Sequence, residues 1–191
     1  MSKKTKLLKQ EFLDKYNPER TIKRAIDSGI AAASQHNVLY SKSCSVEKKK
    51  EIKYRWCIFL TSLIDRYKGV VSVAKYEQDI TRLKSQMNKE FRDGFRDDGN
   101  SSLEPGFRIS HAQKSISVFL KHMWCMGKVH TPPQCPVDRV VLIKAGLSGN
   151  NAGWTHVNSI KEHRVKVGFL IEAMTTKDGS LSEWELRSFS F

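Results

Sequence analysis

The chain has 191 residues, a length that suits one domain or two small lobes and excludes a large modular assembly. Hydrophobic residues make up 39% of it and charged residues 28%, a composition typical of globular rather than disordered or fibrous proteins. No apolar stretch is long enough to cross a bilayer, and the lysine-rich start lacks the apolar core of a secretory signal. We therefore expect a cytoplasmic protein without a membrane partner.

Positive charge is the strongest compositional signal. The chain carries 33 Lys and Arg against 20 Asp and Glu, a formal net charge of +13. Residues 1–55 contribute +8 of this excess, whereas residues 129–191 contribute +1. Because a surface of this charge attracts polyanions, we expect a nucleic acid as the partner. The alternative is a soluble protein that simply carries a basic terminal region.

The first half of the chain is predicted to be helical, after a basic segment over residues 1–16. Asn17 and Pro18 mark a helix start, since an N-cap residue followed by proline is a favoured beginning. Apolar residues then repeat at helical spacing in three stretches. The predicted helices cover residues 18–35, 52–67 and 73–91, and a polar loop is predicted over residues 92–106.

The second half carries three helix starts marked by capping residues. Ser110 and Gln113 have the spacing of a capping box, and the helix that they begin is apolar on nearly every face. We therefore expect this helix to be central and buried. Asp138 is the predicted cap of a short helix, and Ser159 with Glu162 forms another capping box.

The helical periodicity predicts an all-α protein that forms a single unit over residues 1–191. Residues 105–145 contain most of the residues that could carry chemistry. The C-terminal residues 184–186 are expected to pack back on the body of the protein.

Lys114 lies in the first turn of the predicted buried helix, and Asp138 follows 24 residues later. The positive end of the helix macrodipole and apolar surroundings both favour the uncharged form of such an amine. A neutral lysine attacks the anomeric carbon of a departing glycoside and forms a Schiff base. A carboxylate beside it can take up a proton or stabilise positive charge on a sugar ring. Lys121, one heptad further along, is the rival nucleophile.

The stretches QKSISVFLKHMWCMGK and CPVDRVV resemble the helix-hairpin-helix DNA glycosylases, and among these the archaeal 8-oxoguanine branch. In that superfamily a hairpin binds the DNA backbone, a lysine begins the second hairpin helix, and a downstream aspartate completes the site. The resemblance implies two helical lobes around a DNA-binding cleft. It also implies that Lys114 is the Schiff-base nucleophile and Asp138 the catalytic carboxylate.

The resemblance indicates where DNA would bind. The residues placed to contact phosphate are Arg108, Ser110, His111, Gln113 and Arg139. Excision requires the target nucleotide to leave the duplex, so a base pocket is expected. Its candidates are Trp124, Trp154 and Trp184, for each of which core packing is the alternative. The usual glycine-x-glycine of the hairpin is replaced here by Ser110-His111-Ala112.

No cofactor and no metal is expected. The four cysteines show no C-x-x-C spacing, and no four-cysteine pattern follows Asp138. Neither a zinc site nor the iron–sulfur cluster of some glycosylases is therefore predicted. The simplest interpretation is a set of buried thiols at Cys44, Cys57, Cys125 and Cys135.

The resulting hypothesis is a monomeric DNA glycosylase, with or without AP lyase activity, that acts on duplex DNA with a flipped modified base. Its substrate would be either oxidised guanine or a hypermodified base of bacteriophage DNA, as for some anti-phage glycosylases. The alternative is a non-catalytic DNA- or RNA-binding helical protein. A metal-dependent nuclease is a third candidate, whose acidic residues Asp97, Asp98 and Glu104 fall in the predicted loop.

Overall fold

The computed structural model describes residues 3–35, 39–96, 106–174 and 179–188, and these ranges contain helices and turns but no strand. The prediction of an all-α protein is confirmed. No helix in these ranges is long and apolar enough to cross a membrane. The helices are α1 (Lys3–Tyr16), α2 (Ile22–Ser34), α3 (Val46–Arg66), α4 (Val73–Phe91), α5 (Ile109–Cys125), α6 (Arg139–Lys144), α7 (Ile160–Ala173) and α8 (Leu181–Ser188), with 3₁₀ helices η1 (Arg92–Gly94) and η2 (Gly149–Ala152).

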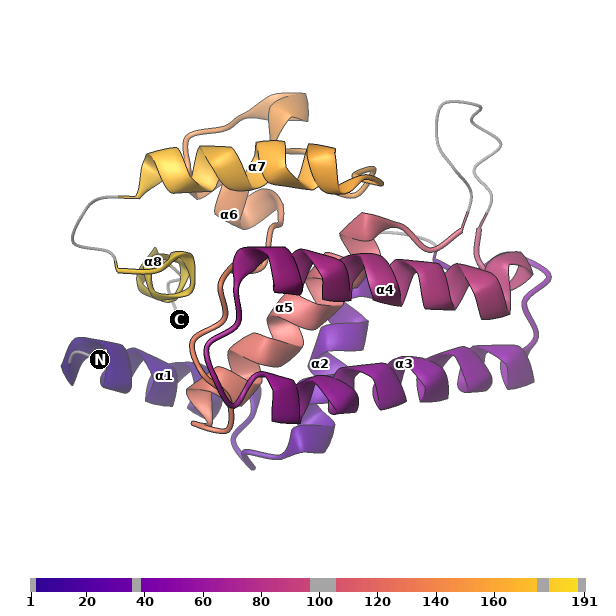
Figure 1. Cartoon of the computed structure of the whole chain (residues 1–191), viewed down its shortest axis with the longest axis horizontal. Coiled ribbons are helices and arrows are strands. Elements are labelled where there is room, and N and C mark those ends of the chain that lie inside the picture. The colour runs from indigo at the N-terminus through magenta and orange to yellow at the C-terminus, as the bar shows by residue number, and fades with distance from the viewer. Residues whose placement is uncertain (1–2, 36–38, 97–105, 175–178, 189–191) are drawn as a thin grey trace.

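Helix α5 is the centre of the fold (Figure 1). Every one of its residues except Val118 is buried, and it contacts α1, α2, α3, α4 and α7. The expectation of a central, buried helix is confirmed. At the crossing with α2, a Cβ on Gly29 would lie only 2.7 Å from the Ser115 carbonyl oxygen. The two helices therefore pack backbone against backbone, which fixes α2 as a wall beside α5.

The described residues form a larger and a smaller hydrophobic core. The larger core joins α1 to α5 and is built around fully buried side chains such as Trp56, Tyr76 and Phe119. The smaller core lies among α6, α7 and α8. Helix α8 reaches both, because Trp184 packs in the smaller core and Leu186 in the larger one. The C-terminal segment thus packs back on the body, as predicted.

Several helix starts differ from the predictions. Helix α2 begins at Ile22 rather than Pro18, because Thr21 is its cap and accepts a hydrogen bond of 3.1 Å from the Arg24 N–H. Helix α3 begins at Val46, well before residue 52, because Ser45 caps it. The predicted bounds of α4 and the Ser159 capping box of α7 are confirmed.

The basic segment 1–16 belongs to the body of the protein. Residues 3–16 form α1, in which Thr5, Lys9, Phe12 and Leu13 are buried. The predicted loop over residues 92–106 lies largely outside the described residues, together with Asp97, Asp98 and Glu104.

Candidate functional site

Lys114 of α5 and Asp138 at the start of α6 form an ion pair. The Lys114 Nζ donates to Asp138 Oδ2, and the two side chains are 10% and 18% exposed. The other carboxylate oxygen, Oδ1, accepts a hydrogen bond of 2.9 Å from the Val141 N–H and so caps α6. Asp138 is therefore both a helix cap and the partner of the lysine, which fixes its carboxylate from two sides.

The neighbouring Gln113 holds the segment that carries Asp138. Its Nε2 donates to the Val137 carbonyl at 2.7 Å, and its Oε1 accepts from the Val137 N–H at 3.3 Å. This pair of hydrogen bonds joins the residue before Lys114 to the residue before Asp138. Gln113 is 1% exposed, so it positions the ion pair from inside the protein.

The predicted capping box of Ser110 and Gln113 is wrong. Helix α5 begins at Ile109 with Arg108 as the cap, and the Arg108 N–H donates to His111 Nδ1 at 3.0 Å. Ser110 donates instead to the Thr155 carbonyl at 2.8 Å. The reason is that His111 takes over the backbone contact that was assigned to Gln113, which shifts the helix start toward the N-terminus.

This shift moves Lys114 from the first turn of its helix into the second. The macrodipole acts mainly within the first turn, so the position of Lys114 no longer supports the dipole argument made from the sequence. Its Nζ instead donates to the Asp138 carboxylate in the ion pair described above.

The rival lysine forms a second ion pair. Lys121 Nζ lies 2.7 Å from the carboxylate of Glu185 on α8, and the side chains are 7% and 3% exposed. The same ammonium group lies 4.7 Å from the centre of the Phe12 ring, within the range of a cation–π contact. This second pair joins α5 to α8 and is buried more deeply than the first.

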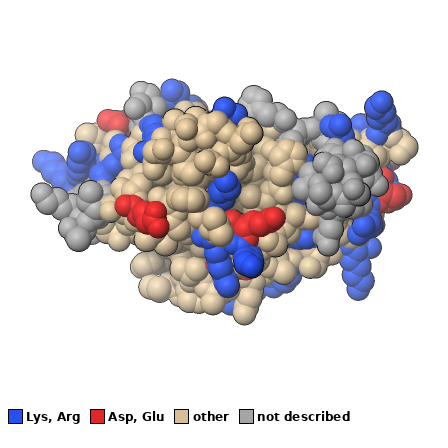
Figure 2. Space-filling view, turned by 90° about the horizontal axis from the view of Figure 1, so that it is seen from above, with Lys and Arg blue, Asp and Glu red and all other residues tan. Residues whose placement is uncertain are grey.

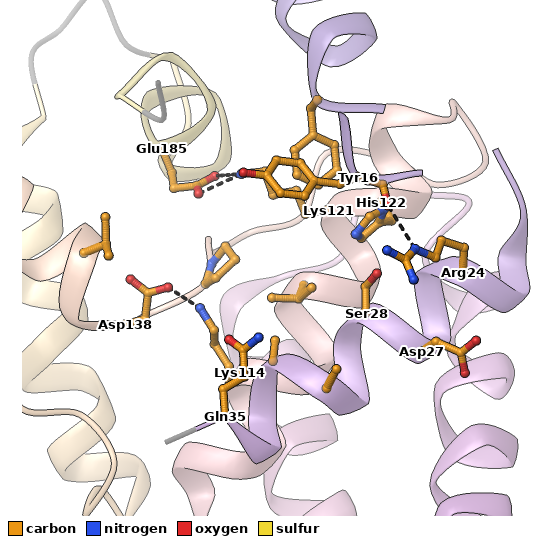
Figure 3. Close-up of a pocket in the computed structure, with 16 residues that line it drawn as sticks. Tyr16, Arg24, Asp27, Ser28, Gln35, Lys114, Lys121, His122, Asp138 and Glu185 are labelled. Atoms are coloured by element: carbon orange, nitrogen blue, oxygen red, sulfur yellow. Dashed lines mark hydrogen bonds and ion pairs between the residues drawn. The ribbon is translucent and has the colours of Figure 1, made fainter. Parts of the chain in front are cut away.

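Both pairs line the same pocket, which has a volume of about 530 Å³ (Figure 3). Helix α5 supplies the two lysines, and α2 forms a wall with polar side chains. The carboxylate of Asp138 lies at the start of α6, and that of Glu185 lies within α8. The volume lies within the range of small-molecule sites. The polar and charged lining residues are Tyr16, Arg24, Asp27, Ser28, Gln35, Lys114, Lys121, His122, Asp138 and Glu185.

The aromatic side chains of the pocket come from α1 and were missed by the sequence analysis. Phe12 and Tyr16 line it, with ring centres 5.2 Å apart. The centre of the His122 ring lies 4.8 Å from the centre of the Phe12 ring. Lys9, Phe12 and Tyr16 have the spacing of one helix face, which indicates that this face packs on the protein. The many lysines around them indicate only a basic segment.

None of the three tryptophans predicted for a base pocket is among the residues that line this one. Trp124 lies in the larger core, where Lys9 Nζ is 3.9 Å from the ring centre. Trp154 and Trp184 belong to the smaller core. The centre of the Trp154 ring lies 5.7 Å from Lys114 Nζ.

The residues predicted to contact phosphate have different surroundings. Arg139, directly after Asp138, is exposed. Ser110, His111 and Gln113 are at most 1% exposed and have the internal partners described above, and Arg108 is 8% exposed. In this conformation only Arg139 of the five offers an open side chain to a ligand.

His122 lies in the pocket as a neutral imidazole at pH 7. Burial, with the nearby charges of Lys121 and Arg24 as further causes, lowers the pKa of His122 to about 4. Its Nδ1 is buried and has no hydrogen-bond partner among the described residues. The ring therefore adds a polar but uncharged surface to the pocket.

The cysteines and acidic residues give no metal site within the described ranges, where no group of three His, Cys, Asp or Glu side chains could hold an ion. All four cysteines are free thiols. Cys44, Cys125 and Cys135 are buried, as predicted, and Cys57 is half-buried. Burial raises the pKa of the Cys125 thiol to about 12, so this neighbour of the lysines is not a reactive thiolate.

The face of the protein above α7 carries both signs of charge (Figure 2). Uncharged residues cover most of this face, and acidic side chains lie among the basic ones. The small excess of positive charge in residues 129–191 agrees with this distribution.

Comparisons with protein-family models, with curated proteins and with solved structures give no match to this chain. The candidate site therefore depends on its own geometry: an amine, a carboxylate and an adjoining pocket.

Proposed function

We propose that the protein is a DNA glycosylase in which Lys114 is the nucleophile and Asp138 its proton acceptor. The observation that carries the proposal is their ion pair on the wall of a pocket of about 530 Å³. A structural salt bridge needs no cavity beside it, whereas a nucleophile has to be reachable. An extruded nucleotide is a ligand that such a pocket could hold.

The chemistry follows from the pair. Asp138 accepts a proton from the Lys114 ammonium group, and the free Nζ attacks C1′ of the deoxyribose. The C1′–N bond breaks, its electrons leave with the base, and the base takes up the proton held by Asp138. The carboxylate, now ionised again, stabilises the positive charge on the sugar and accepts a proton from the new secondary ammonium group. That proton passes to O4′ as the C1′–O4′ bond breaks, and the lone pair on Nζ forms the Schiff base with C1′.

An AP lyase step would start from this Schiff base. Loss of a C2′ proton expels the 3′ phosphate, and hydrolysis of the imine restores the amine. The proposal includes the two helical lobes around a DNA cleft, a monomer acting on duplex DNA, and a cytoplasmic location. The two hydrophobic cores and the net charge of +13 support it.

Of the two substrate classes, the pocket favours a base that carries an additional polar substituent. Its volume exceeds that of one flat base, and its α2 wall presents Arg24, Asp27, Ser28 and Gln35. Such side chains suit hydroxyl groups, because they combine hydrogen-bond donors with acceptors.

An excision assay tests the proposal. Duplexes that contain oxidised guanine, hydroxymethylated or glucosylated cytosine, or only ordinary bases would be incubated with the protein and then cleaved at abasic sites with alkali. We expect abasic sites on a modified duplex, most of all on the glucosylated one, and none with Lys114→Gln. Lys128→Gln is the matched control, because Lys128 is exposed and outside the pocket. DNA binding without abasic sites on every duplex would leave the non-catalytic alternative.

A further inference from the structure

A second depression, of about 810 Å³, lies between α2 and α3. On the α2 side its lining runs from Lys23 to Ser34 at helical spacing, so it follows one face of the helix for nearly its whole length. On the α3 side it is lined by Lys50, Lys53, Tyr54 and Cys57. At 1.5 Å per residue the groove is about 16 Å long, enough for a few nucleotides of an extended strand.

The edges of this groove are basic. Lys23, Lys50 and Lys53 line it and are exposed, and Asp27 is the single carboxylate among the described residues of its lining. Asp27 pairs with Lys23 at 2.7 Å, which leaves Lys50 and Lys53 as the excess positive charge. Both belong to the segment of residues 1–55 that carries +8. The groove therefore attracts a chain of negative charges such as a phosphodiester backbone.

Two tyrosines line the groove, and their aromatic rings would allow it to hold bases as well as phosphates. Tyr54 is 65% exposed, so its ring is open to a stacking partner. Tyr40 lines the same groove, and its hydroxyl is buried with no hydrogen-bond partner in the described part of the chain. A positive groove with aromatic rings is the pattern of single-stranded nucleic-acid binding, in which bases stack on the rings.

The groove lies directly beside the candidate active site. Asp27 and Ala31 line both the groove and the pocket of Lys114, so α2 is the ridge between them. We infer that the groove between α2 and α3 binds an unpaired stretch of the DNA strand next to the extruded nucleotide, with phosphates at Lys50 and Lys53 and a base stacked on Tyr54. The inference rests on the proposed function for the identity of the strand, but the binding chemistry needs no excision.

The test measures binding of a fluorescent oligothymidine, which contains no excisable modified base, over a range of salt concentrations. Lys50→Gln with Lys53→Gln should reduce the salt slope by about 1.4, because each phosphate contact contributes about 0.7 for single strands. Tyr54→Ala should weaken binding about tenfold without changing the slope, since stacking involves no counterion release. Lys128→Gln with Lys161→Gln is the control, two exposed lysines outside the groove.

The outcomes separate the inference from the proposed function. The inference is overturned if the groove variants bind oligothymidine with the affinity and salt slope of the wild type, or if they lose no more than the control pair. A protein that forms no abasic sites but shows the two different groove effects would refute the proposed function and uphold the inference. Circular dichroism of each variant checks that the helices are intact.

Discussion

The pocket contains two lysine–carboxylate pairs whose chemistry is the same and whose surroundings differ. Lys114 and Asp138 are 10% and 18% exposed, whereas Lys121 and Glu185 are 7% and 3% exposed. Asp138 sits at a helix start on a segment held by Gln113, and Glu185 lies within α8. The proposed function assigns the more exposed pair to the substrate, and the more buried pair is better placed to hold two helices together.

This comparison shows that a buried charge pair does not by itself indicate catalysis. Two opposite charges taken out of water have to compensate each other wherever they are. What distinguishes Lys114 is the combination of access, a carboxylate fixed from two sides, and an adjoining cavity.

The largest expected effect is the difference in excision rate between the variants of the two lysines. Lys114→Gln should lower the single-turnover rate on a modified duplex by on the order of a thousandfold or more, because the covalent step is lost. Lys121→Gln should keep a Schiff base that borohydride can trap. Quenched-flow or gel assays of both variants provide the measurement, and equal losses in the two would remove the distinction between the pairs.

The more buried pair should dominate stability. Lys121→Met leaves Glu185 as an uncompensated buried charge, so the free energy of unfolding should fall by about 3–5 kcal/mol. Adding Glu185→Leu removes that charge and should restore most of the loss. Urea denaturation followed by circular dichroism measures both. A cost below about 1 kcal/mol for the single variant would show that the pair is not needed to join α5 and α8.

Asp138→Asn isolates the charge of Asp138 from its role as a cap. Asparagine caps helices as well as aspartate does, so the free energy of unfolding should fall less than in Asp138→Ala, and Lys114 loses its charge partner in both. Excision should fall by about a hundredfold or more, because the amide cannot accept the lysine proton. Asp138→Ala is the companion variant, which should lose the cap as well. Excision at the wild-type rate by Asp138→Asn would contradict the assigned role.

Acidification should destabilise the protein through two buried histidines, His122 in the pocket and His163 in α7. Burial is the first cause that lowers the pKa of His122 and of His163 to about 4. The unfolded state takes up a proton near pH 6.5 and the folded state only near pH 4, so stability is complete above pH 6.5 and is lost as the pH falls toward 4. At pH 5 the loss is about 2 kcal/mol for each histidine.

His122→Phe should therefore weaken the pH dependence. Phenylalanine retains the packing on Phe12 and does not titrate. The change in unfolding free energy between pH 7.5 and pH 5 should be smaller than in the wild type by about 2 kcal/mol. His163→Met makes the same comparison in α7. An unaltered pH dependence in either variant would show that its histidine does not contribute.

The smallest expected effect concerns the link between the two segments of the site. Gln113→Met removes both hydrogen bonds to Val137 and should cost about 1–2 kcal/mol of stability. The excision rate should fall while binding of unmodified DNA stays the same, since Lys114 and Asp138 lose their alignment. Gln113→Glu, which would bury a carboxylate against the Val137 carbonyl, should be more impaired in folding. Equal rates in Gln113→Met and wild type would exclude a positioning role.

The sequence was sufficient for those parts of the site that have local signals. Asp138 could be found from its cap position before a short apolar helix, and Lys114 from its place on a helix that is apolar all round. The all-α fold followed from helical periodicity. The start of α5 was misplaced because His111 forms a backbone contact that no capping pattern describes.

The remaining parts of the site depend on tertiary packing. Phe12, Arg24 and Glu185 come from three helices that are far apart in the sequence, and no spacing connects them. The tryptophans suggested a base pocket by residue type alone, but burial placed them in the cores. The residues assigned to phosphate contact were taken from the hairpin pattern, and four of those five side chains are buried.

The most direct test of the central claim is to locate the covalent bond. The protein would be incubated with a modified duplex and borohydride, digested, and analysed by mass spectrometry. The account predicts a reduced deoxyribose adduct on Lys114 and none on Lys121. An adduct on Lys121, or a wild-type protein that excises the base and never forms an adduct with any lysine, would contradict it.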